Sequence, residues 1–196
     1  MTGGTATTGQ SSPSPTLPRW GRELNSSPQR GEGGRGEDEK GGTVIIGMGN
    51  RLLSDDGVGY AVAVAVAERL KGRLNLTVTE LQVGGIRLME AMAGFRRAVV
   101  VDAMLSGAPA GTLLRFDPKE FVTTKNTFSS HDTDFATAYD LGRMAGVPLP
   151  EQVSFWGIEA REFDLFGERF SDEVAAAVPE AVNRIVAELT GWEGTA

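Results

Sequence analysis

The sequence predicts an α/β domain of three layers, in which helices cover both faces of a twisted, mostly parallel sheet of roughly five strands. Two observations predict this fold class. Short apolar runs typical of strands alternate along the chain with longer segments typical of helices. One run, residues 98–101, is apolar without interruption, as central parallel strands are. The chain has 196 residues and 40% hydrophobic side chains, enough for one ordinary domain, which we expect over residues 43–192.

The first half of this domain alternates between strands and helices. Residues 44–47 read as a short buried strand, and residues 76–81 as a second strand. Residues 58–70 alternate Ala with Val, as strands do, but their length, alanine content and charged end favour a helix. After a loop at 83–85, the apolar spacing of residues 86–92 predicts a short helix.

The second half continues the pattern with one irregular stretch. Residues 98–101 form a strand that ends at Asp102, and residues 112–116 form the next strand. Residues 117–130 show no regular pattern. Residues 132–145 are predicted to be helical, because the periodic segment stops at a Gly-Val-Pro sequence.

A final strand and a final helix complete the domain. Residues 153–158 are the last apolar strand. Ser171 is a candidate N-cap followed by two acidic residues, which favours a helix that runs to about Leu189. Pro179 lies inside this helix and is expected to bend it or divide it into two.

The N-terminal segment, residues 1–42, is predicted to be disordered. It contains ten Gly and four Pro, and its apolar residues are too sparse to offset the entropy lost on ordering. Its five basic and five acidic side chains cancel, so the net charge of −7 belongs to the rest of the chain. An acidic domain repels phosphate backbones, which argues against nucleic-acid binding.

The chain contains no cysteine, which excludes a disulfide framework, a thiolate nucleophile and a cysteine metal site. No apolar run approaches the roughly 20 residues needed to span a bilayer. Residues 1–10 lack the basic and apolar parts of a secretory signal. We therefore expect a cytoplasmic, monomeric protein without membrane contact.

The stretch most informative about function is residues 47–59, GMGNRLLSDDGVG, between the first strand and the first helix. Glycines at such a turn let the backbone adopt conformations that a Cβ forbids. Asp55 and Asp56 follow these glycines, at the carboxyl end of the strand, where open α/β sheets bind their ligands. Packing alone does not explain two adjacent carboxylates at this place.

Three side chains are candidates for chemistry: Asp56, Asp102 and His131, which is the only histidine in the chain. Two carboxylates and an imidazole suit a borderline divalent metal ion. They could equally act as acid and base around a substrate. Each also has a structural alternative, because Asp102 could cap a turn, Asp56 could stabilise a helix N-terminus, and His131 could be a capping or surface residue.

Residues 47–59 resemble the signature of the hydrogenase maturation proteases, the endopeptidases that trim the large subunit of nickel-iron hydrogenases. The G-x-G-N turn and the D-[DE]-G-x-G segment of that family both occur here in full. The resemblance covers about residues 43–190. It includes an aspartate at the end of a valine-rich strand, an S-x-H segment and the family's closing pattern at residues 153–179.

The resemblance implies that Asp56, Asp102 and His131 recognise nickel inside the immature large subunit. Nickel would then arrive with the substrate, and no permanently bound cofactor is expected. The partner is the nickel-iron hydrogenase large-subunit precursor. The implied activity is that of an endopeptidase of the aspartic type, whose cut at the C-terminus of the precursor activates the hydrogenase.

Asn50 and the glycine pair Gly84 and Gly85 are predicted to contact the substrate, although the pair could also be only a tight turn. Two positions depart from the pattern of many family members. Asp56 stands where some members have Glu, and a shorter carboxylate reaches less far toward a metal. Ala160 stands where many members have Pro.

The catalytic residues stay open, with Asp56 and Asp102 as candidates. A single histidine cannot form the H-E-x-x-H motif of zinc proteases. A triad of Ser129, His131 and Asp102 is conceivable, but the chain has no G-x-S-x-G elbow. An aspartic dyad would require Asp56 and Asp102 to share a proton. The interpretation we favour is that docking of the nickel places the C-terminal peptide of the substrate for cleavage.

Two other functions compete with this interpretation. A nucleotide-binding module could hold a pyrophosphate at the glycine-rich turn. However, Leu52 replaces the third glycine of the dinucleotide fingerprint, and the two aspartates would repel phosphate. A non-catalytic adaptor of the same fold would bind the precursor without cutting it, and the presence of all three candidate residues argues against that function.

Overall fold

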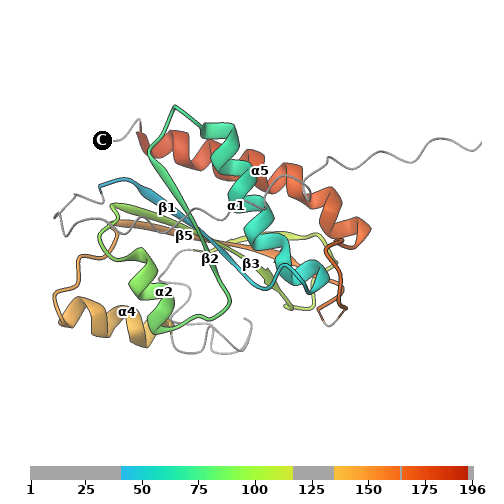
Figure 1. The fold of residues 1–196 in the computed structure, drawn as a ribbon, viewed down its shortest axis with the longest axis horizontal. Helices are drawn as coiled ribbons and strands as arrows, with labels where there is room; N and C mark the ends of the chain where they lie inside the picture. Colours follow the sequence, from blue (N-terminus) through green and yellow to red (C-terminus); the bar gives the residue numbers. More distant parts are fainter. Residues whose placement is uncertain (1–40, 117–134, 164, 194–196) are drawn as a thin grey trace, which may run out of the picture. The chain divides into compact units, whose positions relative to one another are not determined.

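The structure is a computed structural model that describes residues 41–116, 135–163 and 165–193 (Figure 1). A five-stranded sheet in the order β2-β1-β3-β5-β4 runs through these residues. Its strands are β1 (Thr43–Met48), β2 (Leu76–Leu81), β3 (Arg97–Met104), β4 (Leu113–Phe116) and β5 (Gln152–Glu159). Neighbouring strands are parallel except β4, which pairs antiparallel with β5. The predicted five-stranded, mostly parallel sheet is confirmed.

Helices cover both faces of this sheet, which makes three layers (Figure 1). The described helices are the 3₁₀ turn η1 (Ser54–Gly57), α1 (Val58–Leu70), α2 (Ile86–Met92), α4 (Phe135–Met144) and α5 (Asp172–Glu193). Helices α1 and α5 share one core with alternate residues of the strands. Helices α2 and α4 share a second core with the other residues of the same strands.

The central strands β1 and β3 are largely apolar because both of their faces are covered. All six residues of β1 are buried. Since side chains alternate along a strand, Ile45 enters the core under α1, whereas Val44 and Ile46 enter the core under α2. Strand β3 divides in the same way, with Val99 on the α1 face and Val100 on the α2 face.

Most predicted elements are confirmed, and α1, β2 and α2 have the predicted bounds. The prediction that β3 ends at Asp102 is wrong, because the strand continues to Met104, which pairs with Glu159 of β5. Helix α5 is continuous through Pro179, so the helix is not divided there. The turn η1 is an element that the sequence pattern did not predict.

Several predictions concern residues outside the described ranges. These are the irregular segment, His131, and the N-terminal segment as far as residue 40. The disorder of the N-terminal segment stays a prediction. Within the described ranges, no helix combines the length and the apolar character needed to cross a membrane.

Candidate active site

The order of the strands creates a switch point between β1 and β3. The chain leaves β1 through α1 on one face to reach β2, and then returns through α2 on the opposite face to β3. The strand order therefore reverses between β1 and β3, and the carboxyl edge of the sheet at such a reversal is where doubly wound sheets bind ligands. Asp56 follows β1 and Asp102 lies near the end of β3, so both candidates lie at this switch point.

Glycines bring η1 and the start of α1 close to the strand ends. A Cβ at Gly59 would overlap the backbone oxygen of Val101 and come within 2.6 Å of that of Met48. Gly49 has a φ of 103°, a conformation that favours glycine, and a Cβ there would overlap the backbone of Asp56. The glycine signature therefore packs the turn that carries Asp56 directly against β1 and β3.

The carboxylate of Asp56 is partly buried and only partly used within this turn. Its Oδ2 accepts a hydrogen bond of 2.7 Å from the backbone N–H of Asn50. No described residue donates a hydrogen bond to its Oδ1. Asp56 therefore keeps an oxygen that can bind a metal ion or a substrate group.

Asp55 has the opposite environment, although it is the next residue in the chain. Its side chain is fully buried. Its two oxygens accept hydrogen bonds from the backbone N–H groups of Arg161, Glu162 and Ser171 and from the Ser171 hydroxyl. The Asp55 carboxylate is therefore buried and occupied by hydrogen bonds within the protein. The sequence alone did not show which of the two aspartates is buried.

Asn50 shapes the turn that holds Asp56. Its Oδ1 accepts a hydrogen bond of 3.0 Å from the N–H of Leu52, and its backbone oxygen accepts one of 3.0 Å from the N–H of Leu53. The side-chain oxygen of Asn50 thus closes an Asx-type turn. Contact of Asn50 with a substrate stays a prediction.

Asp102 is half-buried on β3, in register with Gly157 of β5. By the alternation along β3, it lies on the same face as Ala98 and Val100, the face that α2 and α4 cover. His131 precedes α4 and lies outside the described residues, which resume with this helix at Phe135. The convergence of Asp56, Asp102 and His131 therefore stays a prediction, and the described residues alone contain no group of three potential metal ligands.

Gly84 and Gly85 lie in the loop between β2 and α2, at the same edge of the sheet as Asp56. Gly85 is buried, has a φ of 60° and accepts a hydrogen bond from the N–H of Met89 at the start of α2. The side chains on either side of the pair, Val83 and Ile86, are 50% and 55% exposed. Gly85 therefore takes a conformation that favours glycine at the N-cap of α2, and the role of the pair in holding a peptide stays a prediction.

A further carboxylate at this edge, Glu159, is buried at the end of β5. It accepts hydrogen bonds of 2.8–3.0 Å from the backbone N–H groups of Ser106 and Gly107, and one of 2.6 Å from the Ser106 hydroxyl. Glu159 therefore shapes the connection from β3 to β4. In the sequence, Glu159 is marked only by its position at the end of an apolar strand. That position does not reveal hydrogen-bond partners more than 50 residues away in the chain.

Away from this edge, burial raises the pKa of the Tyr139 phenol on α4 above its ordinary value of 10.0, and the charge of Asp140 raises it further against the opposing effect of Arg143. The Tyr139 hydroxyl donates to the backbone oxygen of Pro150, which is a structural contact.

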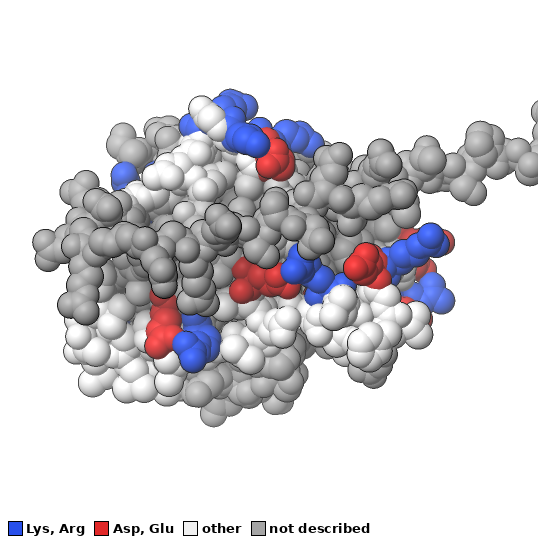
Figure 2. Space-filling model, in the orientation of Figure 1, with Lys and Arg blue, Asp and Glu red and all other residues white. Residues whose placement is uncertain are grey.

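On the face in Figure 2, described side chains of both signs lie beside one another rather than in a basic patch. The described part of this face therefore gives no support for binding a phosphate backbone.

Comparison with known proteins decides the family. The hydrogenase maturation protease family matches residues 61–188, well over half of the chain. The chain belongs to this family. Asp102 and His131 lie within the matched range, and the turn with Asp56 lies directly before it. As a hydrogenase maturation protease the chain is a peptidase, and the nucleotide-binding alternative loses its support.

Relatives and solved structures agree with this assignment. The hydrogenase expression/formation protein HoxM of Cupriavidus necator is 27% identical over 154 residues, which are 77% of this chain and 75% of HoxM. A putative hydrogenase maturation protease of Methanocaldococcus jannaschii is 27% identical over 151 residues, which are 74% of this chain and 95% of that protein.

Among solved structures, the [NiFe] hydrogenase maturation protease HybD of Thermococcus kodakarensis is similar with a TM-score of 0.54 and 30% identity, over 75% of this chain and 97% of HybD. The hydrogenase maturating endopeptidase HybD of E. coli has a TM-score of 0.57 at 24% identity, over 76% of this chain and 92% of its own, which shows the shared fold.

Proposed function

We propose that this protease removes a C-terminal peptide from the nickel-loaded large-subunit precursor of a nickel-iron hydrogenase. In this proposal the nickel ion is part of the substrate, and Asp56, Asp102 and His131 contact it. The observation that carries the proposal is the position of two carboxylates at the switch point between β1 and β3, one of them with an oxygen that no described residue engages.

The chemistry of these three side chains suits the proposed contact. Carboxylate oxygens and a neutral imidazole are ligands for borderline divalent ions such as Ni²⁺. Binding the ion would fix the precursor in one orientation, so that cleavage of its C-terminal peptide becomes effectively an intramolecular step. The fixed orientation would also restrict cleavage to precursors that already carry nickel.

Hydrolysis adds the oxygen of a water molecule to the peptide carbonyl carbon, breaks the C–N bond and transfers a proton to the leaving amine. Asp56 and Asp102 are the candidates for moving that proton, because a carboxylate can accept it from the water and return it to the amine. Asn50 and the glycine pair Gly84–Gly85 are proposed to hold the peptide beside these two carboxylates. The support for these contacts is that the three residues lie on the connections that follow β1 and β2.

The test is incubation of the protein with a matched large-subunit precursor, with mass spectrometry of the precursor before and after. We expect a single cut that releases a short C-terminal peptide from the nickel-loaded precursor, and no cut in the nickel-free one. Equal processing of both precursors would contradict recognition through nickel. Binding without any cut, for every matched precursor, would favour the adaptor function. Cytoplasmic location and a monomeric state stay predictions.

A further inference from the structure

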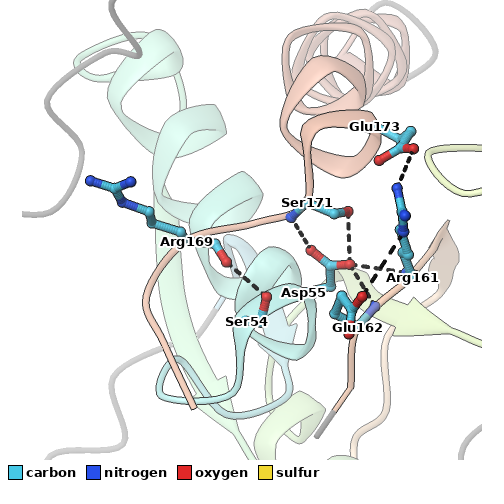
Figure 3. Close-up of polar contacts among 7 residues, drawn as sticks. All are labelled: Ser54, Asp55, Arg161, Glu162, Arg169, Ser171 and Glu173. Atoms are coloured by element: carbon cyan, nitrogen blue, oxygen red, sulfur yellow. Dashed lines mark hydrogen bonds and ion pairs between the residues drawn. The ribbon is translucent and has the colours of Figure 1, made fainter. Parts of the chain in front are cut away.

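The buried carboxylate of Asp55 joins two distant parts of the chain (Figure 3). Its Oδ1 accepts a hydrogen bond of 2.7 Å from the N–H of Ser171. Its Oδ2 accepts three hydrogen bonds of 2.9 Å, from the N–H groups of Arg161 and Glu162 and from the Ser171 hydroxyl. These partners lie 106 to 116 residues further along the chain, on the connection from β5 to α5.

The charge of this carboxylate is balanced by hydrogen bonds rather than by a cation. The Arg161 guanidinium is turned toward Glu173, with which it forms a contact of 2.8 Å, and only its backbone N–H reaches Asp55 (Figure 3). A buried carboxylate without all of its donors is unfavourable, because desolvation of the charge is costly. The connection from β5 to α5 must therefore stay in place for as long as Asp55 is buried and ionised.

The residue before Asp55 is held to the same connection. Ser54 donates hydrogen bonds of 2.7 Å from its N–H to the backbone oxygen of Gly167 and from its hydroxyl to that of Arg169, and the N–H of Gly167 donates to Leu52. Ser54 has a φ of 40°, in the left-handed region that non-glycine residues rarely adopt. Such a conformation persists only when the surroundings determine it, and these contacts do so.

Asp56 follows this clamped pair without a break. Its backbone N–H donates to the oxygen of Leu53, and its Oδ2 accepts the hydrogen bond from Asn50. The turn from Asn50 to Asp56 is therefore braced internally by Asp56 and attached to the rest of the domain through Ser54 and Asp55.

We propose that Asp55 is a positioning residue, which holds the carboxylate of Asp56 at the switch point by anchoring its turn to the connection between β5 and α5. The catalytic consequence rests on the proposed function, whereas the effect on Asp56 itself does not. The two adjacent aspartates thus have separate tasks, one anchoring the turn and the other facing the substrate.

Asp55→Asn tests the proposal, because it keeps the shape of the side chain but replaces an acceptor oxygen by an NH₂ group that faces N–H donors. The first measurement needs no substrate: the NMR signal of the Asn50 amide, which donates to Asp56. We expect Asp55→Asn to move this signal toward its position in Asp56→Asn. The second measurement is the rate of precursor processing per folded molecule. A misplaced Asp56 should reduce it on the order of 100-fold, the effect of a displacement of about 1 Å in an active site.

The matched control is Glu188→Gln. Glu188 lies on α5, and its side chain accepts hydrogen bonds from Arg115, Ser154 and Trp156, away from the carboxyl ends of the strands. The Glu188→Gln variant is expected to have a lower unfolding temperature, but the same Asn50 amide signal and the same processing rate per folded molecule as the wild type. Should Asp55→Asn fail to fold, Ser171→Ala serves instead, since it removes only the hydroxyl donor, and smaller changes of the same kind are expected.

An unmoved Asn50 signal in the folded Asp55 and Ser171 variants would overturn the proposal. A moved signal with an unchanged rate per folded molecule would also overturn it, because Asp55 would then be a structural residue only. If the wild-type protein processes no precursor, the proposed function fails by itself, and the Asn50 signal still decides whether Asp55 positions Asp56.

Discussion

At the scale of single residues, Asp55 and Asp56 show how two identical neighbours take on different roles. The carboxylate of Asp55 is buried and accepts four hydrogen bonds, whereas one oxygen of Asp56 has no described donor. Substitutions of Asp55 should therefore affect the folded structure first, and substitutions of Asp56 should affect function first.

The Asp56 variants are expected to separate charge from shape. Asp56→Ala should fail to process the precursor, because it removes the carboxylate. It should remain folded, because the loss of one hydrogen bond lowers the free energy of unfolding by only about 1–2 kcal/mol. Asp56→Glu should keep part of the activity, since it retains the charge. Asp56→Asn keeps the shape but weakens metal binding, and so should be less active than Asp56→Glu. Mass spectrometry of the precursor and thermal unfolding measure both effects, and full activity of Asp56→Asn would contradict a role of the charge.

Binding of free metal ions tests the proposed ligands without a substrate. The isolated protein is expected to bind Ni²⁺, Zn²⁺ or Cd²⁺ weakly, because three ligands leave coordination positions that the precursor would fill. Binding should weaken further at acidic pH, because a protonated imidazole can no longer bind the ion. Calorimetric titration measures the affinity. His131→Ala should abolish binding, and an unchanged affinity in that variant would remove His131 from the site.

At the scale of elements, the start of α1 is fixed by its close approach to two strands. Helix α1 begins against the carboxyl ends of β1 and β3, where Gly59 leaves no room for a Cβ between the backbone oxygens of Met48 and Val101. The position of η1, and of Asp56 within it, depends on this approach.

Gly59→Ala is therefore expected to destabilise the fold by about 1–3 kcal/mol, the usual cost of overpacking. Gly191→Ala is the matched control, since Gly191 lies in α5 with no atom near an added Cβ. Ala favours a helix over Gly by about 0.5–1 kcal/mol, so this control should stabilise the protein. Chemical denaturation measures both differences, and equal stabilities of the two variants would contradict the close approach.

At the scale of the whole molecule, the sheet brings together residues that are far apart in the chain. Asp56 and Asp102 are 46 positions apart in the sequence and reach one edge because β1 and β3 are adjacent and parallel. Both aspartates lie where the strand order reverses, which is where doubly wound sheets bind ligands.

The N-terminal segment is predicted to be separate from this architecture. Its composition cannot build a core of its own, so removal of residues 1–40 should leave both the unfolding temperature and the processing rate unchanged. Thermal unfolding and the precursor assay of the shortened chain check this expectation. A lower unfolding temperature would show that the segment packs on the domain.

The sequence by itself determined the fold class, the order of most elements, the bounds of three of them and the turn at residues 47–59. The bounds of α1, β2 and α2 follow from local information, because apolar spacing, glycines and charged ends are properties of neighbouring residues. The glycine signature was equally local, and it directed attention to Asp55 and Asp56 as a pair.

Only the tertiary structure decided which aspartate of the pair is buried and where β3 ends. Asp55 is buried because Arg161, Glu162 and Ser171 donate to it, and no local pattern announces donors more than 100 residues away. Strand β3 extends past Asp102 because Met104 finds a partner in Glu159. In both cases the deciding energy comes from hydrogen bonds to distant backbone groups, which form only when the sheet and its connections are assembled.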